Sequence, residues 1–293
     1  MSERFLHGCH LSIAGGIERA IDEAERLGIS ALQIFTHSPS VWAMAPLSEE
    51  TATSFRERRA AAGIGYLVVH TPYLLNLATP DDALWERSTA AFVAEIDRAA
   101  SLGADAVVTH LGAHRGAGVK AGIRRIVAAL EVAHREASFP ASSFELLLEN
   151  TAGAGTTMGR TFDELAAILG ASEDGRMGLC LDSCHAHAGG YDLRTRAALE
   201  ATLSQIDEAV GLGRLRMIHL NDAKHPLGSR RDRHEHIGQG EIGDDGFAAL
   251  INHPRLRALP FVLETPKDLE DGREADPLNL ATIRRLRRKA TSL

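Results

Sequence analysis

The sequence contains few cysteines, which limits the chemistry open to it. Only three of its 293 residues are cysteine, namely Cys9, Cys180 and Cys184, and no two of them form a Cys-x-x-Cys pair. An odd count without such a pair indicates neither a disulfide framework nor a cysteine zinc knuckle. We therefore interpret all three as small buried hydrophobic residues of a protein in a reducing compartment.

Long apolar runs, a positive net charge and two common catalytic motifs are missing as well. No apolar stretch approaches the roughly 20 residues of a membrane span, and residues 1–5 hold no signal-peptide core. A cytoplasmic protein without a membrane partner is the expectation. The formal net charge of −7 argues against a basic protein that coats DNA. Gly153-Ala154-Gly155 lacks the Lys-Ser/Thr of a phosphate-binding loop, and no Gly-x-Ser-x-Gly motif occurs.

Short apolar runs instead alternate with helix-length amphipathic segments. Continuous apolar runs such as Ala106-Val107-Val108 are typical of parallel strands that are buried on both faces. The predicted strands span residues 6–12, 31–35, 66–70, 106–110, 144–148, 178–181, 216–220 and 261–263. The predicted helices span residues 17–27, 49–62, 83–102, 119–135, 162–169, 196–210, 247–251 and 277–289. Eight such pairs predict an α/β fold, a (β/α)8 TIM barrel, as one domain over residues 1–293, because such barrels need about 250 residues.

Potential metal ligands follow these strands or lie in the loops next to them. Six of them end successive predicted strands, the third to the eighth: His70, His110, Glu149, Asp182, His219 and Glu264. Three more lie in the adjoining loops: His185, Asp232 and His234. The carboxyl ends of barrel strands meet at one mouth, where the active sites of such barrels lie. The pattern therefore predicts a metal site at this mouth.

The number and kind of these residues indicate several ions. Imidazole with carboxylate suits zinc, manganese or iron better than calcium or magnesium. Nine ligands exceed the three or four that one ion takes from a protein, so we expect a bridging carboxylate, with Glu149 on the central strand as the candidate. Isolated strand-end histidines are more often merely hydrogen-bonded, and isolated carboxylates are usually solvated loop residues, but these alternatives would have to hold for all nine residues at one mouth. Three divalent ions would bring the formal net charge from −7 to −1, which leaves an anionic partner possible.

The remaining histidines are weaker candidates. Four lie in helices or loops away from strand ends and are interpreted as non-ligands: His134, His187, His225 and His253. Five lie near strand ends or loops of the mouth and stay undecided: His7, His10, His37, His114 and His236. The longest segment without clear periodicity, residues 221–243, is rich in Gly, Arg and His, and a loop of that length is usually functional.

Together these motifs resemble endonuclease IV, the zinc-dependent apurinic/apyrimidinic endonucleases (AP endonuclease family 2) of the xylose-isomerase-like barrels. The resemblance covers nearly the whole chain, from residues 8–12 to residues 263–265. Its most specific parts are Leu-Glu-Asn-Thr-Ala-Gly at 148–153 and Leu-Asp-Ser-Cys-His-Ala at 181–186. His-Leu-Asn-Asp at 219–222, Asp-Arg-His at 232–234 and Gly-Gln-Gly-Glu-Ile-Gly at 238–243 add to it.

The resemblance implies three zinc ions, with manganese possible in place of one or more. By the family pattern one ion is held by His70, His110 and Glu149, a second by Glu149, Asp182, His219 and Glu264, and a third by His185, Asp232 and His234. Members cleave the phosphodiester on the 5′ side of an abasic site in duplex DNA during base excision repair. They leave a 3′-hydroxyl and a 5′-deoxyribose phosphate, the activity of a phage-T4-type deoxyribonuclease IV, and many also trim blocked 3′ ends. Glu149 is the catalytic candidate, because it would help to orient the attacking hydroxide, and the family pattern favours a monomer.

DNA contacts are implied by two further segments. Residues 70–77 resemble the family's loop that enters the minor groove, with Tyr73 and Leu74 as wedges at the abasic position; capping of the barrel mouth is the alternative. After the residues that match 35–36, many members carry a Lys or Asn and then an Arg before a Trp. The corresponding segment here, His-Ser-Pro-Ser-Val-Trp at 37–42, lacks both cations. Arg230, Arg231 and Arg233 are the candidates to replace them on phosphates, and in that case binding should weaken steeply with salt. Plain surface solvation is the alternative for these arginines.

Two other functions remain as alternatives. A sugar isomerase or epimerase of the same barrel superfamily would use one or two Mn²⁺ or Mg²⁺ ions and would explain only Glu149, Asp182, His219 and Glu264. A damage-binding protein with structural zinc would bind DNA without cutting it, because closed zinc sites hold no water. The five additional ligands favour the nuclease over the isomerase.

Overall fold

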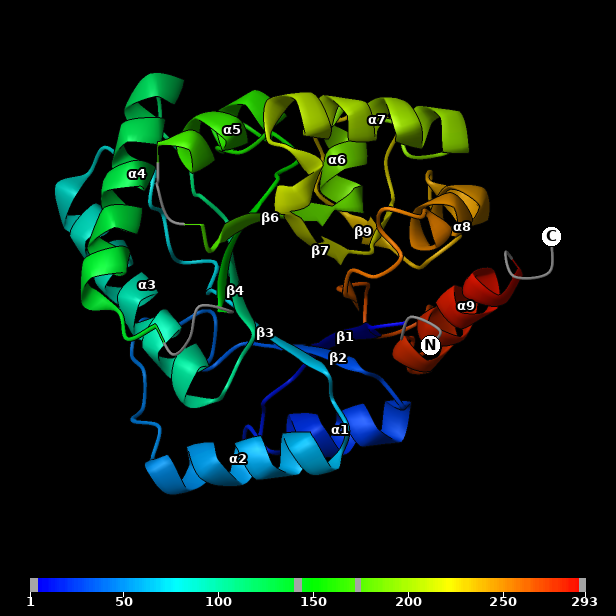
Figure 1. The fold of residues 1–293 in the computed structure, drawn as a ribbon, viewed down its shortest axis with the longest axis horizontal. Coiled ribbons are helices and arrows are strands. Elements are labelled where there is room, and N and C mark those ends of the chain that lie inside the picture. The colour runs from blue at the N-terminus through cyan, green and yellow to red at the C-terminus, as the bar shows by residue number, and fades with distance from the viewer. Residues whose placement is uncertain (1–4, 140–143, 172–174, 290–293) are drawn as a thin grey trace.

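Eight parallel strands form a closed ring with helices around its outside in the computed structural model, which describes residues 5–139, 144–171 and 175–289 (Figure 1). The strands are β1 (His7–Leu11), β2 (Ala31–Ile34), β3 (Tyr66–His70), β4 (Ala106–Thr109), β5 (Glu145–Glu149), β6 (Met177–Asp182), β7 (Leu215–His219) and β10 (Phe261–Leu263). Their order around the ring is β1-β10-β7-β6-β5-β4-β3-β2, and β2 pairs with β1 to close it. The predicted TIM barrel is confirmed.

The helices follow the strands as predicted, and only their ends shift. They are α1 (Arg19–Leu27), α2 (Glu49–Ala61), α3 (Asp82–Ser101), α4 (Val119–Glu136), α5 (Phe162–Gly170), α7 (Arg196–Ala209), α8 (Gly243–Asn252) and α9 (Asp276–Lys289). Side-chain caps explain several starts: Ser48, Asp81 and Thr195 each accept a hydrogen bond from a backbone N–H of the first turn. Gly28 ends α1 in the left-handed conformation, with φ 61°.

Three parts of the chain depart from the prediction. The short helix α6 (Ser183–Gly189) and the 3₁₀ turn η1 (Leu212–Arg214) were not anticipated. Residues 221–243, predicted as one long loop, contain the two-stranded antiparallel ribbon of β8 (Asp222–Ala223) and β9 (His234–Glu235). Each strand of that ribbon has two residues, which is too short to leave a period-2 signal in the sequence.

The core has two layers, because neighbouring residues of a strand face opposite sides of the sheet. One apolar cluster lies between the strands and the surrounding helices. A second cluster fills the inside of the ring and consists of Ala31, Val68, Ala106, Val108, Leu147, Cys180, Met217 and Val262. Side chains two residues apart on a strand face the same side of the sheet. On each strand that contributes to the inner cluster, the residue two positions after the cluster residue therefore also points inward, at the carboxyl-terminal mouth of the barrel.

Within the described residues, no helix is long and apolar enough to cross a membrane. All three cysteines are buried and unpaired, as predicted. Burial raises the pKa of the Cys184 thiol, and burial raises that of Cys180 to about 11, so both keep their protons at neutral pH.

Candidate metal centre

The predicted ligands form a ring at the mouth because of the strand period. Two residues after an inner core residue come His70 on β3, Glu149 on β5, Asp182 on β6 and His219 on β7. His110 and Glu264 follow the inner residues of β4 and β10 by the same spacing. The same rule applied to Ala31 of β2 gives Gln33, which is fully buried and which metal-ligand chemistry alone did not identify.

The three remaining candidates reach the ring from loops. Asp182 ends β6 and also caps α6, since its Oδ1 accepts the backbone N–H of His185 at 2.6 Å. This turn brings His185 beside its own strand end. Asp232 and His234 come from the segment that forms the β8–β9 ribbon, and Asp232 Oδ2 lies 3.2 Å from His185 Nε2.

Nitrogen and oxygen atoms of these residues cluster into groups that could hold metal ions. In each group one ligand atom per residue lies within 4.8 Å of all the others: His70, His110 and Glu149; Glu149, Asp182, His219 and Glu264; His185, Asp232 and His234; and Asp182, Cys184 and His234. The first three groups have the composition that the family resemblance implies. The fourth adds Cys184, which the sequence led us to treat only as a buried hydrophobic residue.

Glu149 is at the centre of the cluster and is completely buried. Its Oε1 lies 3.1 Å from His219 Nδ1 and 3.2 Å from His185 Nδ1. Its Oε2 lies 3.3 Å from His70 Nε2 and 3.5 Å from His110 Nε2. A carboxylate with imidazoles at both oxygens has the geometry of a bridge between two sites.

Hydrogen bonds outside the ring hold three of these histidines in one orientation. Nδ1 of His70 donates to Thr71 O at 2.7 Å, and Nδ1 of His234 donates to Glu264 O at 2.9 Å. Nδ1 of His185 lies 3.0 Å from Asn150 O. In a neutral ring a proton on Nδ1 leaves Nε2 with its lone pair, and Nε2 faces Glu149 in His70 and Asp232 in His185 and His234. Second partners of this kind are typical of histidines that bind metal.

One buried nitrogen atom of the cluster has no hydrogen-bond partner among the described residues, and its surroundings show whether a cation would fit there. Nε2 of His234 is buried and has no hydrogen-bond partner within the described part of the chain. It lies 3.5 Å from Asp232 Oδ1 and 3.8 Å from Asp182 Oδ2. An unpaired buried nitrogen between two carboxylates is costly unless something binds there. The donor set of imidazole and carboxylate fits a divalent transition metal.

The charged side chains of the cluster shift one another's pKa values. Burial would raise the pKa of Glu149, but the charges of His110 and His219, together with hydrogen bonds from His185 and His219, hold it well below its usual value. Burial would lower the pKa of His185, whereas Asp182, Asp232 and Glu149 raise it well above its usual value. The carboxylate of Glu149 and the imidazolium of His185 therefore favour each other's charged form, and bound cations would take over the role of that positive charge.

The predicted DNA-contacting residues lie around this mouth. Tyr73 follows β3 with 69% of its surface exposed, and its ring packs edge-on against Phe35 at 5.4 Å. Leu74 is half-buried beside it. Arg230, Arg231 and Arg233 are exposed on the segment that carries Asp232.

The undecided histidines separate into two sets. His10 belongs to the mouth, since its Nδ1 accepts from Gln33 Nε2 at 2.9 Å and lies 3.7 Å from Glu264 Oε1. The other four make contacts elsewhere: His7 with Phe5 and Arg284, His37 with Glu95, His114 with backbone N–H groups of its own loop, and His236 with Asn279. None of the four histidines interpreted as non-ligands belongs to a candidate metal group of the described residues.

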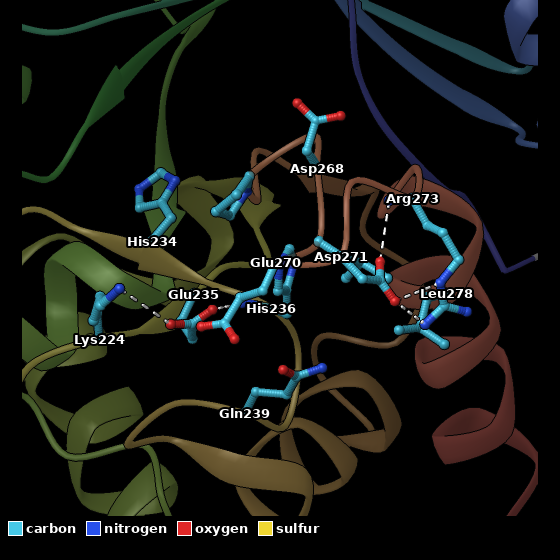
Figure 2. Close-up of a pocket in the computed structure, with 12 residues that line it drawn as sticks. Lys224, His234, Glu235, His236, Gln239, Asp268, Glu270, Asp271, Arg273 and Leu278 are labelled. Carbon is cyan, nitrogen blue, oxygen red and sulfur yellow. Dashed lines mark hydrogen bonds and ion pairs between the residues drawn. The ribbon is translucent and has the colours of Figure 1, made fainter.

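Three hollows lie at or near the mouth. One of about 350 Å³ is lined by ligand candidates themselves, including His70, His110 and Glu264. A second of about 390 Å³ runs between Tyr73, Leu74, Arg115 and the loop after β5. A third of about 740 Å³ lies on the far side of His234, and Figure 2 shows Lys224 paired with Glu235 and Arg273 paired with Asp271 within it.

The barrel and its ring of ligand candidates define a TIM-barrel protein with a potential polynuclear metal centre. A family model described as xylose isomerase-like TIM barrel matches residues 21–288. A protein of Methanoculleus marisnigri called probable endonuclease 4 is 48% identical over 282 residues, which are 96% of this chain and 98% of that protein. The crystal structure of endonuclease IV from Thermus thermophilus is 39% identical with a TM-score of 0.85, over 97% of this chain and 99% of that one. The chain therefore belongs to the endonuclease IV family.

The barrel is also shared more widely. A D-tagatose 3-epimerase-like protein matches 98% of this chain and 97% of its own with a TM-score of 0.70, but at 16% identity. Such a likeness concerns the fold alone. The alternative of a sugar isomerase or epimerase is therefore not favoured.

Proposed function

We propose that this protein is a metal-dependent DNA-repair endonuclease that hydrolyses the phosphodiester on the 5′ side of an abasic site in duplex DNA. Its products would be a 3′-hydroxyl and a 5′-deoxyribose phosphate, as for the phage-T4-type deoxyribonuclease IV, and blocked 3′ ends would be trimmed at the same site. The observation that carries this proposal is the set of overlapping ligand groups that share Glu149. Membership of the endonuclease IV family supports it.

The proposed ligands are the nine residues predicted from the sequence. They would hold three zinc ions, with manganese able to replace one or more: His70, His110, Glu149, Asp182, His185, His219, Asp232, His234 and Glu264. When bound, such ions activate water at neutral pH and stabilise the charge that develops on the phosphate oxygens. A monomer in the cytoplasm is proposed as the working state.

The chain's own residues would orient the reaction. Glu149 is buried among four imidazoles, so its carboxylate has a fixed position from which it can direct the attacking oxygen. Exposed Tyr73 and its neighbour Leu74 would enter the duplex, because an abasic nucleotide lacks pairing and stacking and costs least to extrude. The exposed Arg230, Arg231 and Arg233 would contact phosphates and fix the register of the duplex.

Glu149→Gln tests this proposal. The amide keeps the size of the side chain but loses its charge. We therefore expect cleavage of a 5′-labelled duplex with one tetrahydrofuran abasic analogue to fall by about 10²–10³-fold, the usual effect of removing one key electrostatic group. Wild-type protein loaded with zinc should give a single nick with a 3′-hydroxyl, and prolonged chelation should abolish it. Leu74→Ala is the comparison, with reduced DNA binding but an intact metal centre.

Two results would contradict the proposal. Near-wild-type turnover by folded Glu149→Gln would remove Glu149 from the catalytic role. An intact DNA strand after incubation with folded wild-type protein that carries its metal ions would instead favour a protein that binds damaged DNA without cutting it.

A further inference from the structure

Gln33 occupies the β2 position of the ring at the mouth and is fully buried. It follows the inner core residue Ala31 by two positions, as the ligand candidates follow theirs. Its register partner on β1 is His10. A neutral amide is a weak ligand for zinc, so its place among imidazoles and carboxylates needs another explanation.

The contacts of Gln33 fix the orientation of its amide. The Nε2 group lies 2.6 Å from Glu264 Oε1 and 2.9 Å from His10 Nδ1. An ionised carboxylate only accepts hydrogen bonds, so the NH₂ end of the amide must be the end that faces Glu264. The carbonyl end then faces His219, whose Nε2 lies 2.7 Å from Gln33 Oε1. Because a carbonyl only accepts, Nε2 of His219 must carry the proton.

In the neutral imidazole, which is the form that binds metal, this proton leaves the other nitrogen of His219 with a free lone pair. Nδ1 of His219 lies 3.1 Å from Glu149 Oε1 and 3.3 Å from Glu264 Oε2. The oxygen of Glu264 that is not bonded to Gln33 is therefore the one that faces His219 Nδ1. The amide of Gln33 thus determines which atom of His219 (Nδ1) and which atom of Glu264 (Oε2) stays available to a metal ion.

We infer that Gln33 is a positioning residue of the metal centre, which fixes the tautomer of His219 and the free oxygen of Glu264. The inference rests on the proposed function. The contrast with three other histidines supports it, since backbone carbonyls orient His70 and His234 and a carbonyl adjoins His185. Of these four histidines, His219 is the one whose orientation depends on a side chain that a substitution can remove. Partners of this kind typically change metal affinity by about 10–100-fold.

Zinc titration of the metal-free full-length protein in competition with a chromogenic chelator tests Gln33→Met. Methionine keeps the volume but neither accepts from His219 nor donates to Glu264, so we expect one zinc equivalent to bind about 10–100-fold more weakly. The visible absorption of the cobalt-loaded protein should change as well. Asn279→Leu is the matched control, because it removes another buried amide, one that bonds Ile237, His236 and Thr265 instead.

Unchanged affinities and an unchanged cobalt spectrum in folded Gln33→Met would overturn the inference. If that variant does not fold, Gln33→Asn takes its place, because its shorter side chain cannot span both contacts, and the same weakening is expected. Failure of the proposed function would look different, since wild-type protein would then either bind no ions or bind them and leave the abasic strand uncut.

A different observation concerns Arg115, in the loop between β4 and α4. Its backbone is left-handed, with φ 44°, in a loop where Gly112, Gly116 and Gly118 also have positive φ. Glycine adopts this conformation without cost, whereas an L-residue with a side chain is strained there by about 1 kcal/mol or more. An arginine at this position therefore needs a reason other than the loop's backbone.

The surroundings of Arg115 point to an anion. It is exposed and lines the 390 Å³ groove beside the metal centre together with Tyr73, Leu74 and Asp232, and among the described residues no other Lys or Arg lines that groove. Within residues 5–139, 144–171 and 175–289 its guanidinium makes no hydrogen bond or ion pair. The hollow on the other side of His234 is lined by four carboxylates and two cations, so its charge disfavours a phosphate.

We propose that Arg115 contacts a backbone phosphate of the DNA strand that lies in this groove. This proposal also rests on the proposed function. It accounts for a departure seen in the sequence, because residues 37–42 hold no Lys or Arg and His37 is turned inward, with Nδ1 2.8 Å from buried Glu95. Arg115 would supply positive charge on the loop next to the Tyr73 wedge.

Arg115→Gly gives a test with two readouts of opposite sign. Because glycine relieves the left-handed strain, the melting temperature should stay the same or rise. Affinity for an abasic duplex should fall, and the slope of log K against log salt should become shallower by about 0.9, the value for one phosphate contact. Arg135→Ala is the matched control, since it removes an equally exposed arginine from the far end of α4 and should leave the slope unchanged.

An unchanged salt slope in Arg115→Gly, with wild-type DNA binding and cleavage, would overturn this proposal alone. A lower melting temperature would also count against it, because Arg115 would then have a structural role in its loop. Absence of DNA binding by the wild-type protein would instead remove the proposed function itself.

Discussion

Asp222 shows how a single residue shapes the segment that carries Asp232 and His234. It is fully buried, and its two oxygens accept hydrogen bonds from the backbone N–H groups of Ala223, Gly238, Gly240 and Ile242, at 2.8–3.0 Å. Burial raises the pKa of Asp222, and these four N–H groups oppose that rise because they favour the carboxylate. The chain has no regular structure at residues 237–242 that could satisfy the same groups.

Asp222→Ala should therefore destabilise the protein strongly. It leaves several buried N–H groups without an acceptor, each worth about 1–3 kcal/mol, so we expect the free energy of unfolding to fall by about 3–5 kcal/mol. Urea denaturation followed by circular dichroism measures this. Glu208→Ala, which removes an exposed carboxylate from α7, should change it by less than about 0.5 kcal/mol. A small loss in Asp222→Ala would mean that water replaces the carboxylate.

The site could be predicted at the residues whose chemistry is visible in the sequence. His70, Glu149 and His219 follow apolar runs, and imidazole or carboxylate at a strand end signals a ligand. Gln33 was missed because amides carry no such signal, although its spacing of two from Ala31 contains the information. Arg115 was missed because its left-handed backbone and its place in the groove depend on tertiary structure.

Helices and strands with a clear hydrophobic periodicity in the sequence were predicted correctly, and elements without such a periodicity were not. Eight strands and eight helices of the barrel left apolar runs or amphipathic segments long enough to read. The ribbon of β8 and β9 has only two residues per strand, and α6 lies directly after β6 with buried residues on all sides, so neither shows a pattern. These are also the elements that bring His185 and His234 to the mouth.

Close approach of two elements gives Gly8 a role that composition does not reveal. A Cβ atom at Gly8 would lie 1.6 Å from the carbonyl oxygen of Ala31, its register partner on β2. This contact is with backbone, so no side-chain movement relieves it. Only glycine lets β1 pair with β2 and close the ring at this point, and His10 and Gln33 lie two residues further along the same pair of strands.

At the scale of the whole molecule, the candidate metal centre would join the carboxyl ends of several strands, including strands that do not pair with one another in the ring. Its proposed ligands come from β3, β5, β6 and β7, from the segments after β4 and β10, and from α6 and the β9 region. Several of these segments are far apart in the sequence, from residue 70 to residue 264. Bound ions would therefore act as cross-links across the mouth, and they would offset the mutual repulsion of its four carboxylates.

Metal removal should consequently lower the stability of the entire barrel. Each ion present at a thousand times its dissociation constant adds about 4 kcal/mol, and for a domain of this size each kcal/mol raises the melting temperature by about 2 °C. We therefore expect calorimetry to show a loss of about 8 °C for each ion that chelation removes, and recovery when zinc is restored. Glu149→Gln, which weakens two ligand groups at once, should show a smaller shift than the wild type. The melting temperature could instead stay unchanged although elemental analysis shows that the metal has been removed. The ring of ligand residues would then be rigid without its ions, and the surrounding histidines alone would neutralise the clustered carboxylates.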